Sequence, residues 1–273
     1  MNLFVTGASG FIGKNFCKEA LKAGHKIFAP TRKKKFSFTH RNMIWLKGEF
    51  FYNWKKSLSN SHMLVHFAAS GVKSDYENDI YDLNIFQSLK LFKNAVSNKC
   101  KNWLLISTSS EYGLKKKKTY FSIKTNRIPE TNYGLSKAIF TDECKKLAKK
   151  HKCKLRIMRL FPIYGSGENK KRLYPSLIYH IKNNKNFYVK KPNKIRDFTH
   201  VDYATAVILN ALNFKKKEFK HNQIWHVSKN ETFSVKKFVK QICKINNAKN
   251  RLFFNKKNKK SYNHLSDKKS VWK

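Results

Sequence analysis

Short apolar runs alternate with segments of helical periodicity along the first two-thirds of the chain. The runs predict strands at residues 3–6, 26–29, 43–46, 63–68, 103–107 and 155–161. Apolar side chains at helical spacing predict the intervening helices, at residues 11–23, 80–97 and 133–151. A later strand is expected at residues 223–228, and an amphipathic helix at residues 234–245. This alternation is typical of an α/β fold with a Rossmann-like, doubly wound parallel sheet.

A glycine-rich turn follows the first predicted strand and opens the first predicted helix. In the segment TGASGFIG, residues 6–13, Gly7, Gly10 and Gly13 are spaced three apart. Small residues let the backbone approach a pyrophosphate, and the amides and dipole at the helix N-terminus stabilise its negative charge. The spacing differs from the commoner G-x-G-x-x-G pattern. Its position between a strand and a helix nevertheless predicts a dinucleotide-binding loop.

The segment after the second predicted strand bears on the choice of cofactor. It reads APTRKKK and lacks the acidic residue that would accept hydrogen bonds from the adenosine ribose. Arg32 stands in that neighbourhood, and a guanidinium suits the 2′-phosphate of NADP. NADP is therefore the expected cofactor. NAD is the alternative, in which case Arg32 is one basic surface residue among many.

A Tyr and a Lys four residues apart open the predicted helix at residues 133–151. Tyr133 and Lys137, in the segment YGLSK, then share one helix face. The reference pKa of tyrosine, about 10, is too high for proton transfer at neutral pH, and a neighbouring ammonium together with an oxidised nicotinamide would lower it. We expect Tyr133 to shuttle a proton and Lys137 to hold the nicotinamide ribose.

Several hydroxyls end the predicted strand at residues 103–107, beside the expected cofactor crevice. Thr108 is the preferred third catalytic residue, because its hydroxyl can bond the substrate oxygen that Tyr133 protonates or deprotonates. Ser107, Ser109 and Ser110 remain alternatives. Any one of these hydroxyls can instead cap the end of the strand.

Further motifs complete a resemblance to a known family. In chain order with the glycine loop, STSSEYG and YGLSK, the sequence contains HFAA at residues 66–69, Asn84, RLFPIYG at residues 159–165 and RDFTHVD at residues 196–202. The chain resembles the extended short-chain dehydrogenases/reductases of the NAD-dependent epimerase/dehydratase family, which modify nucleotide sugars. The resemblance covers nearly the whole chain. It implies an enzyme whose substrate is a nucleotide-activated sugar.

The resemblance also implies binding roles. Glu49 and Ala68 would border the adenine half of the cofactor, Phe161 the nicotinamide, and Arg196 the substrate diphosphate, whereas His66 is expected to pack or cap at its strand end. The substrate set is Ser109, Ser110, Arg172, Leu173 and Arg196. The full cofactor set is Gly7, Ser9, Gly10, Phe11, Ile12, Gly13, Thr31, Arg32, Glu49, Phe67, Ala68, Ala69, Asn84, Tyr133, Lys137 and Phe161.

Three departures from the family pattern narrow the expected reaction. Ser109 and Ser110 stand where sugar 4,6-dehydratases of the family carry acidic residues, which disfavours dehydration. Pro162 replaces an Asn often found in that loop, and the short C-terminal part leaves a smaller cap than typical epimerases have. We expect 4-keto reduction. The alternatives are 4-epimerisation with a retained NAD and, in a different class, a non-catalytic redox sensor or RNA-binding protein.

Domain organisation and assembly follow from the same segments. We expect an NAD(P)-binding Rossmann domain at residues 1–165 and a small substrate-binding cap at residues 166–273, with segments near 196–228 returning to the Rossmann core. A homodimer is expected, with a four-helix bundle as in the family that the chain resembles. Its apolar surface would come from Ile85, Leu89, Phe92, Val96, Leu135, Ile139 and Leu147.

Composition changes this picture little. Lys and Arg number 59 against 16 acidic residues, a net charge of +43, which raises the possibility of a nucleic-acid or anionic-membrane partner. The basic runs at residues 32–35, 115–118, 215–217 and 256–260 fall between the periodic segments, where solvated loops are expected, so nucleic acid is not the expected partner. The five scattered cysteines predict buried free thiols and no metal site. A strand directly after Met1 and the lack of any apolar stretch of roughly 20 residues predict a cytoplasmic protein without a membrane span.

Overall fold

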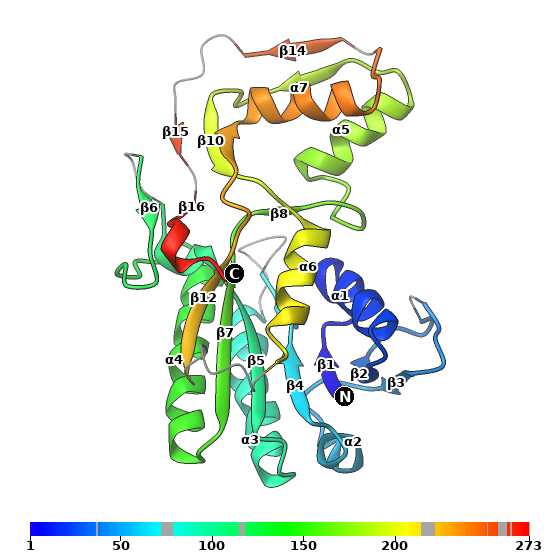
Figure 1. Cartoon of the computed structure of the whole chain (residues 1–273), viewed down its shortest axis with the longest axis vertical. Helices are drawn as coiled ribbons and strands as arrows, with labels where there is room; N and C mark the ends of the chain where they lie inside the picture. The colour runs from blue at the N-terminus through cyan, green and yellow to red at the C-terminus, as the bar shows by residue number, and fades with distance from the viewer. Residues whose placement is uncertain are drawn as a thin grey trace.

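The computed structural model describes residues 1–36, 38–71, 79–114, 118–213, 222–249, 251–255, 261–262 and 264–272. Within these ranges the main sheet has seven strands, all parallel, in the order β12-β7-β5-β4-β1-β2-β3 (Figure 1). Their bounds are β1 Asn2–Thr6, β2 Lys26–Thr31, β3 Met43–Lys47, β4 Met63–His66, β5 Asn102–Thr108, β7 Lys154–Leu160 and β12 Gln223–Val227. The predicted doubly wound α/β fold is confirmed, and the strand order reverses between β1 and β4.

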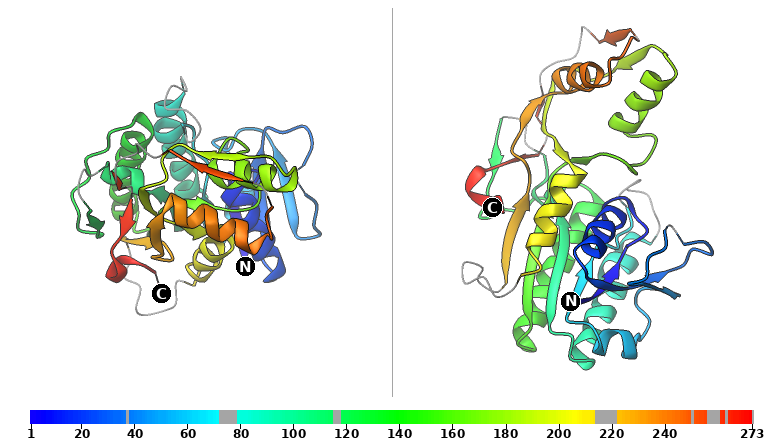
Figure 2. Two further views of the ribbon diagram at one scale, coloured as in Figure 1. Left: turned by 90° about the horizontal axis from the view of Figure 1, so that it is seen from above. Right: turned by 45° about the vertical axis from the view of Figure 1, so that its right-hand side comes forward.

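Helices cover both faces of the main sheet. Helices α1 (Phe11–Lys22) and α6 (Val201–Asn210) pack together on one face, and α3 (Ser88–Ser97) and α4 (Asn132–Lys150) cover the other (Figures 1 and 2). A π-helical turn, η1 (Asp82–Gln87), runs directly into α3, and a short helix, α2 (Lys55–Ser59), precedes β4. Because both faces are covered, the strands are apolar runs rather than alternating apolar and polar positions.

Successive strand residues point into different cores, as the two-residue period of a strand requires. Leu3 and Val5 lie in the core beneath α1 and α6, with Phe16 and Ile208. Phe4 lies in the core beneath α3 and α4. Each of these side chains is 0% exposed. The two cores fix the strand register, since a shift by one residue would exchange the faces.

A smaller unit, which we call the cap, stands beyond the carboxyl ends of the strands, in the upper part of Figure 1. The cap consists of α5 (Leu173–Lys182), α7 (Val235–Ile245), β9 (Phe187–Val189), β10 (Lys194–Asp197), β13 (Thr232–Ser234), β14 (Leu252–Phe254) and β15 (Ser261–Tyr262). It has its own apolar core, in which the rings of Phe198 and Phe238 stack 4.1 Å apart. The pair β8 (Ile163–Tyr164) and β11 (Thr199–His200) leads between the main sheet and the cap.

The end of the chain returns from the cap to the main sheet. Strand β16 (Leu265–Ser266) pairs with β6 (Tyr120–Phe121), and the short helix η3 (Lys268–Ser270) follows it. Trp272 is 1% exposed, packs against Trp225 and donates from its backbone to the carbonyl of His226. The segments that return to the main sheet are therefore not only those near residues 196–228, because Trp272 also packs against β12.

The apolar stripe expected at a dimer interface is mostly core, and this part of the sequence interpretation is wrong. Ile85 and Phe92 are 7% and 0% exposed, and Leu89, Val96 and Leu147 pack partly buried against the same core. Leu135 and Ile139 remain exposed, at 40% and 38%. Helical spacing identified the apolar face of each helix correctly but did not show how much of that face the sheet covers.

Charged loops and thiols lie where the composition suggested. The basic run at residues 32–35 is an exposed loop, and the runs at residues 115–117, 215–217 and 256–260 lie outside the described residues. All five cysteines are buried free thiols, as predicted. Of the helices that the structure describes, none combines the length and apolar character required to traverse a bilayer.

Candidate active site

The residues singled out from the sequence gather at the carboxyl ends of the parallel strands. Each strand from β1 to β7 in the main sheet delivers part of the set, which is the general location of ligand sites in open α/β sheets. In strand order the positions are Gly7 after β1, Thr31 at the end of β2, Glu49 after β3, Phe67 after β4, Thr108 at the end of β5 and Phe161 after β7. The fold thus brings together motifs that are far apart in sequence.

The glycine loop leaves no room for side chains at two positions. Gly7 has a φ of +71°, and a Cβ on it would stand 2.7 Å from the backbone nitrogen of Ala68. A Cβ on Gly13 would stand 2.3 Å from the carbonyl oxygen of Gly7. Helix α1 begins directly after Gly10, with no side-chain cap from the described residues. The loop therefore fits a pyrophosphate, which would take its hydrogen bonds from the exposed amides at the start of α1.

The other predicted residues of this loop are accessible or support it. Ser9, Phe11 and Ile12 are partly exposed, and Gly10 is exposed. Phe67 packs against the Phe16 ring of α1, with ring centroids 5.1 Å apart. The glycine loop is thus partly accessible, and Phe67, in the neighbouring loop after β4, is held against α1.

His66 is a buried structural residue, as predicted. Its Nδ1 lies 2.8 Å from Thr6 Oγ1 and its Nε2 lies 3.2 Å from Ser88 Oγ. Burial, with a smaller contribution from the Lys137 ammonium, holds the pKa of His66 well below its usual value, so the ring is neutral. Thr6 Oγ1 also accepts a hydrogen bond from Ala68 N at 3.3 Å, which ties the loop after β4 to β1.

The residues expected at the adenine end of the cofactor, Arg32 and Glu49, carry opposite charges. Arg32 Nε lies 3.8 Å from Glu49 Oε2, with the two side chains 71% and 26% exposed. Gly48 N donates to the carbonyl of Thr31 at 3.1 Å, which brings the ends of β2 and β3 together. The acid that is absent from the sequence directly after β2 is thus supplied in space by Glu49 after β3. This corner is less basic than the segment APTRKKK alone indicates.

Asn84 joins two walls of the site. Its Oδ1 accepts from Ser70 N at 2.8 Å, and its Nδ2 donates to Ser70 O at 3.0 Å and to Ser136 Oγ at 2.9 Å. The side chain is 1% exposed. In the described structure Asn84 therefore holds the segment after β4 against α4, the helix that carries Tyr133 and Lys137.

The three expected catalytic side chains meet where β5 ends and α4 begins. Tyr133 is hydrogen-bonded to Thr108, and Lys137 Nζ donates to the carbonyl of Ile106 at 3.0 Å. Thr108 Oγ1 also accepts from Ser110 N and donates to Ser110 Oγ, each at 3.1 Å. Thr108 thus caps the short helix η2 (Ser109–Tyr112) as well as reaching Tyr133.

Burial dominates the protonation of this group. It raises the pKa of Tyr133 to about 12, although the hydrogen bond to Thr108 lowers it. Burial also lowers the pKa of Lys137 to about 8, with Glu111 acting in the opposite direction. The lowered Tyr133 pKa expected from the sequence does not hold for the protein alone, because loss of solvation outweighs its neighbours. Tyr133 is therefore a protonated phenol at neutral pH.

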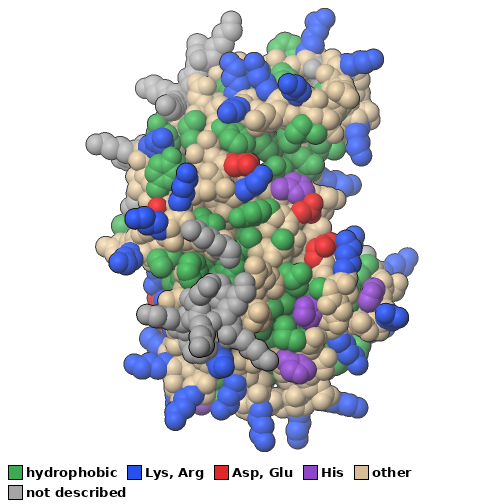
Figure 3. All heavy atoms as spheres, viewed as in Figure 1, with side chains coloured by type: hydrophobic (Ala, Val, Ile, Leu, Met, Phe, Trp, Pro, Cys, Tyr) green, Lys and Arg blue, Asp and Glu red, His purple; other side chains and the backbone are tan. Residues whose placement is uncertain are grey.

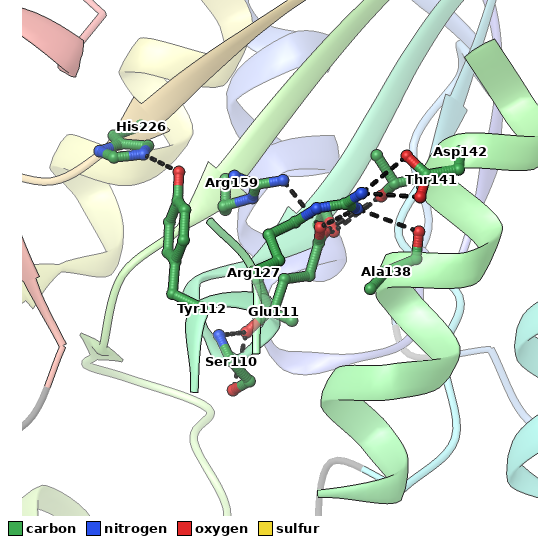
Figure 4. Close-up of polar contacts among 11 residues, drawn as sticks. Ser110, Glu111, Tyr112, Arg127, Ala138, Thr141, Asp142, Arg159 and His226 are labelled. Carbon is green, nitrogen blue, oxygen red and sulfur yellow. Dashed lines mark hydrogen bonds and ion pairs between the residues drawn. The ribbon is translucent and has the colours of Figure 1, made fainter. Parts of the chain in front are cut away.

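A buried carboxylate is held by side chains from β5, β7 and α4 (Figure 4). Glu111, 0% exposed, accepts from Thr141 Oγ1 at 3.0 Å and from the hydroxyl of Ser107. Its other oxygen receives Arg159 Nη2 at 2.7 Å and Arg127 Nη1 at 3.1 Å. Two guanidinium groups and two hydroxyls therefore surround one carboxylate, which satisfies the requirement that a buried charge be paired and hydrogen-bonded.

Arg127 connects this carboxylate to α4. Its Nη2 lies 2.6 and 2.9 Å from the two carboxylate oxygens of Asp142, and its Nη1 donates to the carbonyl of Ala138 at 3.2 Å (Figure 4). The segment that follows Thr108 is thereby clamped to α4, the helix that carries Tyr133. The sequence analysis missed this network. The available signals were an acid inside STSSEYG and an arginine within an apolar strand.

A cavity lies between the β8 segment, which follows the main sheet, and the cap. Arg172, Leu173 and Arg196 line it, as the resemblance implied for the substrate. Arg172 also lowers the pKa of Tyr133, so the two side chains interact electrostatically. Ser109 is 3% exposed and is not among the residues that line this cavity. The remaining lining residues are Pro162, Ile163, Tyr164, Glu168, Tyr174, Phe198 and Phe238. Figure 3 shows the outline of the molecule indented at its right side, between the upper and lower parts.

The glycine loop and the Thr108, Tyr133 and Lys137 group can now be compared with known proteins. A sequence model described as the NAD dependent epimerase/dehydratase family matches residues 3–227. The chain belongs to this family. The family assignment agrees with the resemblance drawn from the motifs and establishes an NAD-dependent enzyme type.

Individual members of the family are similar over most of the chain. A protein named as an uncharacterized UDP-glucose epimerase of Bacillus subtilis is 26% identical, in an alignment that spans 94% of this chain and 86% of that protein. A dTDP-4-dehydro-6-deoxyglucose reductase of Escherichia coli is 22% identical, in an alignment that spans 88% of this chain and 80% of that protein. The crystal structure of UDP-glucuronic acid 4-epimerase from Bacillus cereus, in complex with UDP-glucuronic acid and NAD, superposes with a TM-score of 0.83 at 22% identity, covering 98% and 90%.

Proposed function

We propose that the protein reduces the 4-keto group of a nucleotide-activated sugar with a nicotinamide cofactor. The observation that carries the proposal is the protonated Tyr133 hydrogen-bonded to Thr108, four residues from Lys137 and beside a cavity lined by two arginines. Reduction of a ketone requires a proton donor next to the reacting oxygen, and a neutral phenol is such a donor. A relative named as a reductase of a 4-dehydro sugar nucleotide supports the same reaction.

Each part of the site has a role in this reaction. A nicotinamide cofactor, when bound, supplies the hydride. The amides at the start of α1 hold its pyrophosphate, and Lys137 orients its ribose. Thr108 positions the substrate oxygen and Tyr133 donates the proton to it. Arg172 and Arg196 bind the diphosphate of the substrate, because guanidinium groups pair well with phosphate oxygens.

Epimerisation at the same carbon is the second candidate. A relative named as a UDP-glucose epimerase favours it. It would use the same residues, with Tyr133 first accepting and then returning a proton and with the cofactor regenerated in each turnover. Burial keeps Tyr133 protonated in the free protein, which is the form that reduction uses, whereas oxidation of the sugar hydroxyl requires the phenolate. A sensor or RNA-binding protein has no need of the Thr108, Tyr133 and Lys137 group.

A substrate panel tests these alternatives. Nucleotide sugars and their 4-keto forms are incubated with NADH or NADPH, or with NAD, and the products are identified by mass spectrometry. Reduction of a 4-keto sugar with oxidation of the cofactor supports the proposal. Interconversion of two sugars without net cofactor oxidation supports the epimerase. Absence of turnover, together with salt-sensitive binding of RNA, supports a non-catalytic role.

Cofactor choice depends on the Arg32 and Glu49 pair. We propose that Arg32 binds the 2′-phosphate of NADP, for which Glu49 is the unfavourable neighbour at 3.8 Å. Arg32→Ala is expected to weaken NADP binding about tenfold more than NAD binding, because only NADP carries the phosphate. Glu49→Gln is the matched variant and should strengthen NADP relative to NAD. Equal changes in the two dissociation constants, measured by fluorescence titration, contradict the proposal.

The family resemblance also leads us to propose a homodimer through η1 and α4. Phe86 is 65% exposed, and Leu135 and Ile139 add exposed apolar surface on α4. Burying such side chains between two subunits removes apolar area from water, and repulsion between like-charged subunits is screened beyond about 8 Å at physiological salt. Sedimentation equilibrium should give twice the chain mass for the wild type and a weakened dimer for Ile139→Glu. A monomer across the micromolar range would refute the dimer.

A further inference from the structure

Two residues that line the cavity below the cap each have a buried polar atom, a hydrogen-bond acceptor in one and a donor in the other. Glu168 Oε2 and Arg196 Nε are both inaccessible to solvent, and neither has a hydrogen-bond partner among the described residues. Both side chains line the same cavity, together with Arg172. Buried polar atoms are nearly always paired in folded proteins, so unpaired atoms on two residues that line one cavity indicate a ligand that bonds to them.

Glu168 is held in place by its backbone. Its N–H donates to the carbonyl of Gly165 at 3.3 Å, in the turn between β8 and α5. In the part of the chain that the structure describes, no arginine or lysine forms an ion pair with it within 4.0 Å, although Arg172 and Arg196 act on it electrostatically. Burial raises the pKa of Glu168 to about 7 and outweighs both arginines. Glu168 is therefore easily protonated in the free protein.

The other described ionisable groups around the cavity do not form a hydrogen bond with the unpaired oxygen of Glu168. Burial raises the pKa of Tyr174, and the charges of Asp202 and Glu168 raise it further. Tyr164 has its pKa raised mainly by burial, and its ring packs against that of His200, which faces Asp202 at 3.3 Å. None of these groups donates a recorded hydrogen bond to Glu168 Oε2, which stays unpaired.

An ionised Glu168 conflicts with the diphosphate that the proposed function places here. Two phosphate charges would pair with Arg172 and Arg196 and remove the positive field that favours the carboxylate. A like charge within a few ångströms of a buried carboxylate favours its protonated form. A protonated carboxyl, in contrast, has an O–H group that can donate to a phosphate oxygen.

We propose that Glu168 is a substrate-binding residue that takes up a proton when the diphosphate binds and donates a hydrogen bond from its carboxyl group to a phosphate oxygen. The proposal rests on the proposed function, which supplies the diphosphate. Such proton uptake makes the affinity for the substrate fall as the pH rises. Well below pH 7 Glu168 is already protonated in the free protein and the affinity is constant. Above pH 7 each binding event must take a proton from solution, so the affinity falls by up to about tenfold per pH unit.

Calorimetric titration tests this coupling. The probes are UDP-glucose, CDP-glucose, GDP-mannose, ADP-glucose and dTDP-glucose, whose phosphates are diesters and therefore do not titrate near neutral pH. The tightest-binding probe is titrated between about pH 6 and about pH 8.5, in two buffers of different ionisation enthalpy. The wild type should bind weakly at the alkaline end and should take up close to one proton per ligand there.

Two variants isolate the effect of Glu168. Glu168→Gln carries a neutral side chain with a hydrogen-bond donor, so its affinity should match the wild type at low pH and should lose this proton uptake. Lys137, whose pKa is about 8, is present in both proteins, and the difference between them excludes its contribution. Glu143→Gln is the control, since Glu143 pairs with Lys146 on the surface of α4 and should behave as the wild type.

The outcomes separate the two proposals. Binding with the same pH dependence and the same proton count in the wild type and in Glu168→Gln overturns the role of Glu168 and leaves the proposed function standing. A wild type whose affinity does not change with pH overturns it as well, even if the variant fails to fold. Absence of binding by every nucleotide sugar contradicts both proposals.

Discussion

Tyr133→Phe is expected to lower the turnover of the reduction by about 10²- to 10⁴-fold, the usual contribution of a positioned general acid. The substitution removes one hydroxyl, which is hydrogen-bonded to Thr108 and is the proton donor in the proposed reaction. The dissociation constant of the cofactor and the thermal midpoint should change little, because the aromatic ring is retained. Steady-state kinetics and a cofactor titration on the same preparation make the measurement.

Tyr112→Phe is a matched control for this experiment. Tyr112 is also a buried tyrosine, and its hydroxyl lies 2.7 Å from Nε2 of His226 on β12 (Figure 4). Its loss leaves one buried hydrogen bond unmade, which costs about 1–3 kcal/mol of stability, but it removes no proton donor from the reaction. Activity of Tyr133→Phe within about threefold of the wild type would eliminate Tyr133 as the acid.

Glu111→Ala is expected to destabilise the folded protein by about 3–5 kcal/mol, the usual cost of removing one partner from a buried ion pair. The reason is that Arg159, 1% exposed, and the Arg127 group that faces it would lose their shared carboxylate. Chemical denaturation monitored by circular dichroism gives the free energy of unfolding. Activity should fall as well, because the clamp between η2 and α4 sets the position of Thr108 relative to Tyr133.

An exposed ion pair supplies the comparison for Glu111. Glu143→Ala removes a carboxylate that lies 2.6 Å from Lys146, with side chains 38% and 74% exposed, and should cost less than about 1 kcal/mol. The loss in the free energy of unfolding should be clearly larger for Glu111→Ala than for Glu143→Ala. If Glu111→Ala costs no more than Glu143→Ala, other groups balance the buried arginines and the network does not support the site.

The sequence predicted the main sheet well because its strands are buried on both faces. The strands at residues 2–6, 26–31 and 102–108 were each placed to within two residues from apolar runs alone. Three of the described α-helices were missed, α2, α5 and α6, and for the last two the physical reason is clear. Helix α6 (VDYATAVILN) is apolar on most of its surface and so lacks a clear helical period. Helix α5 has Pro175 in its first turn, where proline is tolerated but is commonly taken as a helix breaker.

The site divides in the same way between local and long-range features. Tyr133 and Lys137 could be paired from the sequence because a helix places residues four apart on one face. Glu111 and Arg159 are 48 positions apart and meet only because β5 and β7 are neighbours in the sheet. Glu168 lies in a turn with no periodic pattern, and only the packing of the cap against the sheet reveals its unpaired oxygen. Local spacing thus placed Tyr133 and Lys137 together, whereas tertiary packing determines the groups around them.

The proposed reduction is tested most directly by following the hydride itself. The protein is incubated with a 4-keto nucleotide sugar and a nicotinamide cofactor that carries deuterium on C4 of its reduced ring, and the products are analysed by mass spectrometry. The account predicts one deuterium at C4 of the product sugar for each cofactor oxidised, and loss of this transfer in Tyr133→Phe. Recovery of every 4-keto substrate unchanged, with no deuterium in any sugar and no cofactor oxidised, would contradict it.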